Sequence, residues 1–284
     1  MAPRRKTSRL VTLTTDIGWA YAAQMKAVLA HYVPGGHVVD LSHDLPAFQV
    51  GEAAFLLEHL AGGFPAGTVH IAVIDPGVGG HRVPLIIRCR EGSYLVGPDN
   101  GVLIPLADRL GVAGAYRIDP ARLQTGRRPS ATFEGRDVFA PAAGLLARGV
   151  PPEDLGTPWK AYRPTAMLAT RAGSELRGTV IHVDRFGNLI TDIPGAWLPK
   201  TSRAVTVRIG LRPAAQVPRV RTYEDLRRGQ AGVLVSSFGL VEVSAREIRL
   251  SDRWRVGVGA AVGLALRGAE GPRGRKTVNI RSHR

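Results

Sequence analysis

The sequence of 284 residues contains a single cysteine and no long apolar run. Cys89 alone excludes an internal disulfide and any cysteine-rich zinc or iron–sulfur site. No apolar segment approaches the ~20 residues needed to span a bilayer, and the basic start MAPRRKTSRL lacks the apolar core of a secretory signal. With 44% hydrophobic residues, the composition predicts a soluble globular protein, which we expect in the cytoplasm.

Histidines in metal-binding spacing are also lacking. The eight histidines include no H-x-x-x-H pattern, so no metal site is predicted. The run Ser42-His43-Asp44 is not a catalytic triad, because adjacent residues on an extended chain point to opposite faces.

Acidic residues are outnumbered, and the net charge is +15. Residues 1–10 and residues 268–284 each carry +4, which leaves +7 for the rest of the chain. Such a charge suggests a polyanionic partner. The two basic tails contain no interleaved aromatic residues, however, so solvated tails are favoured over nucleic-acid contact. A basic nucleic-acid-binding protein is kept as a weaker alternative.

The length favours two domains, and the pattern of predicted secondary structure changes near residue 170. Over residues 11–162, strands alternate with helices, as in RLVTLTTDIG followed by YAAQMKAVLAHYV. The apolar run TVHIAVID is typical of a strand buried on both faces of a parallel sheet. This pattern predicts an α/β layered N-terminal domain with a mostly parallel sheet.

Residues 177–267 contain short strands and no convincing helix, which predicts a smaller all-β C-terminal domain. We expect residues 163–176 to be the linker. The stretch 212–230 is interpreted as a loop insertion in the β domain.

Asp16 and Asp75 both follow predicted strands, and in open α/β sheets ligands bind outside the carboxyl ends of strands. Asp16 suits a vicinal diol such as a ribose, but capping of the next helix explains it equally well. In IAVIDPGVGGHR, Pro76 favours an extended backbone at Asp75. The glycines then allow a tight turn with inward N–H groups. Two interpretations stay open: a ligand cradle, or an ordinary Asp75–Arg82 pair that holds a turn.

Three further stretches place polar residues beside glycine. VGPDNG has the chemistry of a simple β-turn, TFEGRDVFAP places Glu134 between aromatic residues, and HVDRFGNLITDI contains Asp184 and Asn188. Each stretch alone is modest evidence of a site. In order along the chain, the motifs are TLTTDIG, DLSHDLPAF, GTVHIAVIDPGVGGHR, VGPDNGVL, TFEGRDVFAPAAGLLARG and VDRFGNLITDI.

Together, these motifs resemble the S-adenosyl-L-methionine (SAM) hydrolases, or SAM hydroxide adenosyltransferases, which are related to the SAM-dependent fluorinase and chlorinase. The resemblance covers residues 10 to about 267. It implies an N-terminal α/β domain, a barrel-like C-terminal β domain, and a homotrimer with SAM bound where neighbouring subunits meet. It also implies cleavage of SAM by water at the ribose 5′ carbon, giving adenosine and L-methionine, with no cofactor.

The resemblance also implies roles for individual residues. Asp16 would hold the ribose hydroxyls, and Phe48 would help wall the site. Asp184 and Asn188 match residues that contact the methionine amino group and the adenine. Asp75 and Arg82 match two members of an Asp-Arg-His set that positions and activates water.

The third member of that set differs here, because Glu134 of TFEGRD stands where the hydrolases usually have histidine. A carboxylate can also accept a proton from water, so hydrolysis is predicted to persist with a shifted pH profile. Glu134 would repel a halide nucleophile, whereas a negative site, with Phe48 or Phe133 adding cation–π contact, suits a sulfonium substrate. The alternatives are a SAM- or adenosine-binding protein with little turnover and, with less support, a halide adenosyltransferase.

Overall fold

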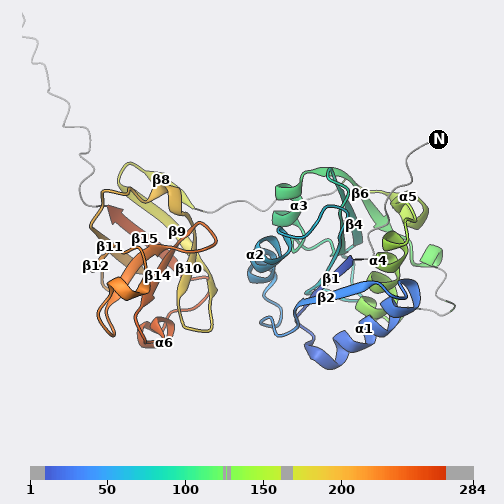
Figure 1. Ribbon diagram of the computed structural model, residues 1–284, viewed down its shortest axis with the longest axis horizontal. Helices are drawn as coiled ribbons and strands as arrows, with labels where there is room; N and C mark the ends of the chain where they lie inside the picture. Colours follow the sequence, from blue (N-terminus) through green and yellow to red (C-terminus); the bar gives the residue numbers. More distant parts are fainter. Residues whose placement is uncertain (1–9, 124–125, 127–128, 161–168, 267–284) are drawn as a thin grey trace, which may run out of the picture. The chain divides into compact units, whose positions relative to one another are not determined.

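The computed structural model describes residues 10–123, 126, 129–160 and 169–266 (Figure 1). They form two compact units, one within Met1–Ala166 and one within Met167–Arg284. Of the predicted linker 163–176, the part up to residue 168 lies outside the described residues, and Thr170–Ala172 form strand β8 of the second unit. The predicted basic tails also lie outside the described residues, apart from Leu10.

The first unit is built on a mixed sheet. Among the described residues, its seven strands have the order β2-β1-β3-β5-β4-β6-β7. The pairings from β2 to β5 are parallel and the other three are antiparallel, so β4 and β7 run against the remaining five strands. The strands are β1 (Leu10–Thr15), β2 (His37–Ser42), β3 (Val69–Val73), β4 (Pro84–Cys89), β5 (Tyr94–Pro98), β6 (Val112–Ile118) and β7 (Gly156–Pro158).

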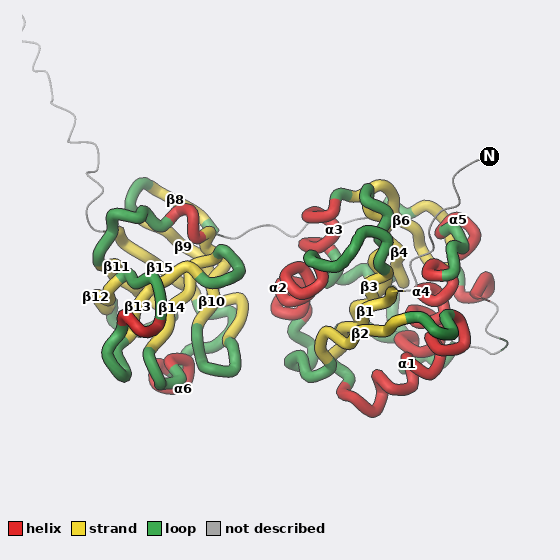
Figure 2. The backbone as a smooth tube through the Cα atoms, in the orientation of Figure 1, coloured by secondary structure: helices red, strands yellow, loops and turns green. Residues whose placement is uncertain are grey.

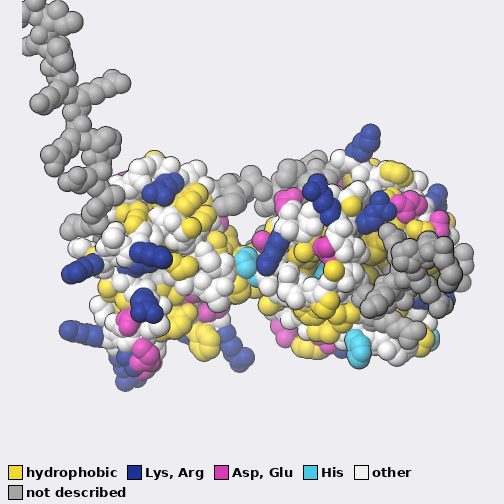
Figure 3. Space-filling view, turned by 45° about the horizontal axis from the view of Figure 1, so that its top comes forward, with side chains coloured by type: hydrophobic (Ala, Val, Ile, Leu, Met, Phe, Trp, Pro, Cys, Tyr) yellow, Lys and Arg dark blue, Asp and Glu magenta, His cyan; other side chains and the backbone are white. Residues whose placement is uncertain are grey.

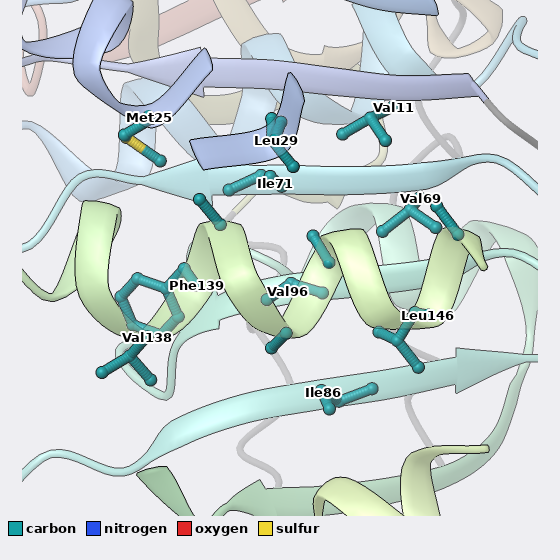
Figure 4. Close-up of a cluster of buried hydrophobic side chains, with 14 of the residues drawn as sticks. Val11, Met25, Leu29, Val69, Ile71, Ile86, Val96, Val138, Phe139 and Leu146 are labelled. Carbon is teal, nitrogen blue, oxygen red and sulfur yellow. The ribbon is translucent and has the colours of Figure 1, made fainter. Parts of the chain in front are cut away.

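Helices cover both faces of this sheet and create two hydrophobic clusters. Because side chains alternate along a strand, Ile71 of β3 faces one cluster while Ala72 faces the other. The first cluster joins the sheet to α1 and α4, and Figure 4 shows Met25, Leu29 and Leu146 packed there. The second joins it to α2 and α3. The helices are α1 (Gly18–Tyr32), α2 (Val50–Ala61), α3 (Ile104–Leu110), α4 (Ala140–Ala147) and α5 (Pro152–Leu155), with 3-10 turn η1 (Pro120–Leu123) and π-helical turn η2 (Gly135–Phe139).

The prediction that TVHIAVID is buried on both faces is confirmed, since every residue of β3 is buried. Several short elements were not predicted, among them α3, β6 and β7. Each is short or weak in local signal: α3 has seven residues, β7 has three, and β6 contains Gly114 and two alanines, which have low β-propensity. Pairing with β4 stabilises β6 in spite of this composition.

The second unit is an antiparallel, nearly closed sheet of short strands (Figure 2). Its order is β12-β11-β15-β9-β10-β14-β13, with β8 paired to β9. A bridge between Arg219 and Val233 joins the two ends of this order, so the sheet closes almost into a barrel. The strands are β8 (Thr170–Ala172), β9 (Glu175–Val183), β10 (Leu189–Pro194), β11 (Ala204–Ile209), β12 (Ala215–Pro218), β13 (Ala231–Val235), β14 (Leu240–Ala245) and β15 (Ala261–Leu266).

The predicted fold class, an α/β domain followed by a smaller barrel-like β domain, is confirmed. The stretch 212–230, interpreted as a loop insertion, instead contributes strand β12 and turn η4 (Tyr223–Asp225). The other helical segments described in this unit are the 3-10 turn η3 (Gly195–Trp197) and α6 (Leu250–Trp254), a helix of five residues.

Charge is distributed unequally between the units. Residues 10–160 contain twelve Lys and Arg against fourteen Asp and Glu, whereas residues 169–266 contain fifteen against eight. Lys and Arg side chains project from the visible face of the second unit (Figure 3). The positive excess of the chain between the tails therefore belongs mainly to the second unit.

Candidate active site

Asp16 and Asp75 lie at the same edge of the first sheet. β1 and β3 are parallel neighbours whose last residues, Thr15 and Val73, are register partners. Each aspartate follows its strand within two residues. The chain leaves β1 toward β2 on one side and returns as β3 on the other, so this edge is a topological switch point. Such points are where open α/β sheets bind ligands.

Arg82 folds back on Asp75 through the turn between β3 and β4. Arg82 Nε donates to Asp75 Oδ1 at 2.9 Å, and Nη2 donates to Oδ2. The two side chains are 10% and 5% exposed, and the guanidinium lies 5.6 Å from the centre of the buried Phe139 ring. A two-point contact of this kind holds a planar guanidinium in one orientation.

Glu134 binds the same guanidinium from a distant loop. Its Oε2 lies 2.6 Å from Arg82 Nη1, as an ion pair rather than a well-aligned hydrogen bond. Burial alone would lower the pKa of Arg82, but its two carboxylate partners outweigh burial and raise that pKa above the ordinary value. Arg82 is therefore a permanent cation between two acids. The predicted set Asp75, Arg82 and Glu134 is brought together.

The loop of Glu134 is held against the turn of Asp75 by close packing. Gly79 has a φ of +74°, and a Cβ at this position would lie 2.5 Å from the carbonyl oxygen of Ala131. Only glycine fits both the backbone conformation and this approach. The interpretation of GVGG as a tight turn agrees with this geometry.

Asp137 fixes the other side of the Glu134 loop. Its buried carboxylate accepts the Ser130 N–H at 3.0 Å and two bonds from Arg136, each 2.8 Å long. Arg136 also lies over the Phe133 ring, 5.0 Å from its centre. The π-helical turn η2 begins directly after Glu134, and such turns are frequent at functional sites.

Asp16 contacts Phe48 and does not cap the next helix. The cap position of α1 is Ile17, with no side-chain cap bond, whereas Asp16 Oδ2 accepts the Phe48 N–H at 3.0 Å. Phe48 has a φ of +68°, unusual for a bulky residue, and its side chain is 70% exposed. The structure thus places these two predicted residues together at the switch-point edge.

Exposed aromatic side chains accompany this edge. Trp19 and Tyr21 in the first turn of α1 are 54% and 55% exposed. The Tyr21 ring meets the partly buried Phe133 edge-on, with ring centres 5.5 Å apart. Phe133 therefore lies beside α1, one residue before Glu134.

Asn100 was missed as a site-supporting residue, because VGPDNG has the chemistry of a simple turn. Its Nδ2 donates to the carbonyl of Ile74 at 2.8 Å, and its Oδ1 accepts the Val102 N–H. Asn100 thereby fixes the backbone directly before Asp75. The signal that could have found it is its place after β5, the parallel neighbour of β3.

Asp184 and Asn188 lie together in the second unit, in the turn between β9 and β10. Asp184 Oδ1 accepts the N–H groups of Phe186 and Asn188, and Oδ2 accepts Asn188 Nδ2, all at 2.9 Å. Asn188 is buried, whereas Phe186 is 72% exposed. The Asp184 carboxylate therefore organises the turn that carries both predicted residues.

In the part of the chain that the structure describes, no three His, Cys, Asp or Glu side chains are arranged to hold a metal ion. No helix there has the length and apolar character needed to cross a lipid bilayer.

Two domain models of one protein family match the chain. Residues 11–156 match the SAM hydroxide adenosyltransferase N-terminal domain, and residues 178–263 match the C-terminal domain of the same family. The chain belongs to the SAM hydroxide adenosyltransferase family. The resemblance inferred from the sequence motifs is thereby confirmed.

Curated relatives within the SAM hydroxide adenosyltransferases cover most of the chain. The chain is 41% identical over 253 residues to a protein of Thermus thermophilus named (R)-S-adenosyl-L-methionine hydrolase, covering 84% of this chain and 94% of the relative. It is 38% identical to a protein of the same name from Salinispora arenicola, covering 85% and 92%. A fluorinase of Actinoplanes is more distant, at 24% identity, covering 89% and 96%.

The fold of the family is also found in solved structures. An uncharacterized conserved protein from Thermotoga maritima matches with a TM-score of 0.83 at 30% identity, over 90% of this chain and 100% of that one.

Proposed function

We propose that this protein hydrolyses SAM by attack of water at the ribose 5′ carbon, giving adenosine and L-methionine. The observation that carries the proposal is the contact of Arg82 with both Asp75 and Glu134, at the same edge of the sheet as Asp16. Relatives at 38% and 41% identity that bear the name (R)-S-adenosyl-L-methionine hydrolase support it. The substrate is SAM itself, and the reaction needs no cofactor.

The chemistry is a displacement at carbon. The water oxygen bonds to C5′, the C5′–S bond breaks, and its electron pair neutralises the sulfonium, so methionine leaves as a neutral thioether. The leaving group needs no acid. The protein's task is to align water opposite the C–S bond, which can supply ~7 kcal/mol or more, and to accept its proton, which typically adds roughly 10²- to 10⁴-fold.

Glu134 is the better placed of the two carboxylates to take that proton. Both oxygens of Asp75 accept from Arg82, and the Asp75 side chain is only 5% exposed. Glu134 Oε2 is buried against Arg82, yet 19% of the Glu134 side chain is exposed. The exposed part therefore belongs to the other atoms of this side chain. We assign Glu134 as proton acceptor in place of the usual histidine, with Asp75 orienting Arg82.

The remaining predicted residues bind substrate in this proposal. Asp16 holds the ribose hydroxyls, and its Oδ1 accepts no hydrogen bond from the described residues. Phe48 and Phe133 supply aromatic surface for the sulfonium. Asp184 and Asn188 contact the methionine amino group and the adenine.

The charge of the site disfavours a halide nucleophile. Two carboxylates oppose one guanidinium, which leaves the set Asp75, Arg82 and Glu134 negative. A carboxylate at contact distance repels an anion by about 1 kcal/mol or more, even with the strong screening of water. Neutral water meets no such penalty, and the sulfonium substrate is attracted.

We further propose a homotrimer in which one subunit's N-terminal domain and a neighbour's C-terminal domain share each SAM site. The exposed aromatic side chains of Trp19, Tyr21 and Phe48 around the Asp16 edge support it, because large apolar groups gathered on a surface often mark a contact. Light scattering on the purified protein tests the mass. Two further points stay predictions: that the protein is cytoplasmic, and that nucleic acid is not among its partners.

The test is incubation with SAM in ¹⁸O-labelled water, with and without chloride, followed by mass spectrometry. Labelled adenosine plus methionine supports the proposal. Intact SAM bound to the protein contradicts it and favours a binding protein, and a chlorinated nucleoside favours halide transfer. Glu134→Gln should lower turnover at least tenfold, while Glu134→His should restore it with a different pH profile. A Gln variant with full rate at every pH would remove Glu134 from the mechanism.

A further inference from the structure

A buried histidine lies directly beneath the turn that carries Asp16. His43 is 1% exposed, and its Nδ1 lies 2.9 Å from Thr15 Oγ1, on the last residue of β1. Its Nε2 lies 3.0 Å from Asp40 Oδ1 on β2, as a close polar contact rather than a well-aligned hydrogen bond. The imidazole thus joins two neighbouring strands at the edge where the proposed ribose site lies. The expectation that Ser42, His43 and Asp44 form no relay agrees with this geometry, because the partners of His43 come from elsewhere.

The far end of this connection is anchored to α1. Asp40 Oδ2 accepts from Lys26 Nζ at 2.8 Å. Burial would raise the pKa of Asp40, but the contacts with Lys26 and His43 outweigh it and hold the pKa below its ordinary value. Asp40 therefore stays ionised and keeps an anion against His43 Nε2. This arrangement fits the tautomer that carries its N–H on Nε2, facing Asp40, in which Nδ1 accepts from the Thr15 hydroxyl.

His43 contacts the chain on both sides of Asp16. Thr15 precedes Asp16, while Gly18 donates its N–H to the His43 carbonyl at 3.1 Å. The Trp19 ring meets the imidazole edge-on, with ring centres 4.7 Å apart at 85°. His43 thus contacts the turn at Thr15, at Gly18 and at Trp19, but not at Asp16 itself.

The same residue begins the segment that ends at Phe48. The Phe48 N–H donates to Asp16 Oδ2 at 3.0 Å, and Phe48 has a left-handed backbone with a φ of +68°. Such a conformation persists in a bulky residue only where its surroundings enforce it. The segment 43–48 is therefore attached to the Asp16 turn at His43 and again at Phe48.

We propose that His43 is a positioning residue that sets the ribose geometry of Asp16 and Phe48 through Thr15 and Asp40. The inference rests on the proposed function, since it takes Asp16 as the ligand of the ribose hydroxyls. A residue acting this way determines specificity for ribose over 2′-deoxyribose, because only a fixed carboxylate discriminates between one hydroxyl and two. Loss of the imidazole should therefore lower discrimination, not just activity.

The chain offers a matched control in His70. This histidine is also buried in the first sheet, and its Nδ1 lies 2.8 Å from the hydroxyl of Thr12 on β1. It has no contact with the Asp16 turn among those the structure describes. His43→Gln and His70→Gln therefore remove the same kind of buried contact from the same unit, and only the first removes it at the proposed site.

The experiment compares kcat/KM for SAM with that for its 2′-deoxyribose analogue. We expect the ratio to fall about tenfold in His43→Gln, as in Asp16→Asn, and to keep its wild-type value in His70→Gln. Asp40→Asn, a milder change of similar shape, should lower the ratio in the same direction if His43→Gln does not fold.

Two results would overturn the inference. If folded His43→Gln or Asp40→Asn keeps the wild-type ratio while Asp16→Asn loses it, the positioning role of His43 is wrong and the ribose role of Asp16 stands. If Asp16→Asn keeps the ratio, the ribose assignment itself fails, and the inference built on it fails too. Circular dichroism of each variant separates these outcomes from unfolding.

Discussion

Arg82 Nη1 and Glu134 Oε2 lie 2.6 Å apart, although 52 positions separate the two residues in the chain. The same guanidinium holds Asp75 through its other nitrogens. A cation shared by two acids lets the carboxylates approach one another without the repulsion that would otherwise separate them. Arg82 is therefore the residue on which the arrangement of the proposed water site depends most.

Replacement of Arg82 by lysine should lower kcat/KM for SAM by roughly 10²-fold or more. Lysine keeps the charge but cannot bind both carboxylates with a planar fork, so water would lose its alignment. Steady-state kinetics on Arg82→Lys checks this. The control is Arg88→Lys, because Arg88 and its partner Glu153 are 30% and 48% exposed. Weakening this ion pair should leave kcat/KM near the wild-type value. Equal kinetics for the two variants would contradict the role of Arg82.

Gly79→Ala should destabilise the protein and reduce turnover together. The new Cβ would lie 2.5 Å from the Ala131 carbonyl oxygen and push the Glu134 loop away from Arg82. Gly92→Ala is the matched control, because Gly92 also has a positive φ, +100°, but nothing within 4 Å of its Cβ. In Gly92→Ala, only the strain of a positive φ at a non-glycine residue lowers stability, by about 1–2 kcal/mol, and turnover should be unchanged. Thermal melts and SAM assays of both variants decide the point, and a Gly79 variant as active as Gly92→Ala would exclude the packing argument.

Stability should fall as the pH drops from about 6.5 to about 4 because of His70. Burial lowers the pKa of His70 from 6.5 to about 4. Within that window the unfolded chain binds the proton and the folded chain does not, so falling pH favours unfolding, by up to about 3 kcal/mol from this group. Below the window both states are protonated and the contribution stops changing.

Urea denaturation of wild type and His70→Gln near pH 7 and near pH 4.5 measures this effect. The glutamine cannot titrate, so the drop in unfolding free energy between the two pH values should be smaller in the variant. An equal drop in both proteins would show that other groups control acid stability.

Asp184 should contribute both to the stability of the second unit and to the affinity for substrate. Two different substitutions separate these contributions. Asp184→Ala removes the acceptor of three hydrogen bonds in the β9–β10 turn and should cost about 1–3 kcal/mol of stability. Asp184→Asn keeps an oxygen for the two backbone N–H groups but loses the charge that faces the proposed methionine ammonium. We expect the Asn variant to remain folded, with KM for SAM raised about tenfold and kcat little changed. An unchanged KM would restrict Asp184 to a structural role.

Local pattern predicted much of the fold. The continuous apolar run of β3 predicted a strand covered on both faces. A strand with one face in water would instead alternate apolar and polar residues. By contrast, β6 was missed, since its Gly and Ala residues carry little local preference and the strand exists through pairing with β4.

The same limit applied to the proposed site. Asp75 and Arg82 could be paired from sequence because a glycine-rich turn of a few residues connects them. His43 gave no usable signal, because its partners Thr15 and Asp40 belong to two strands whose adjacency is a property of the sheet.

The sequence by itself determined the family, the division into an α/β and a β domain, and the residue types available at the site, including Glu134 where histidine is usual. The family and the unusual Glu134 follow from the resemblance of the motifs to the SAM hydrolases, whereas the division into domains follows from local spacing and periodicity. Only the tertiary structure decided that Asp16 contacts Phe48 instead of capping α1, and that Arg82 joins Asp75 to Glu134. Contacts of this kind depend on the direction of side chains and on which strands become neighbours, and both are set by packing of the whole unit.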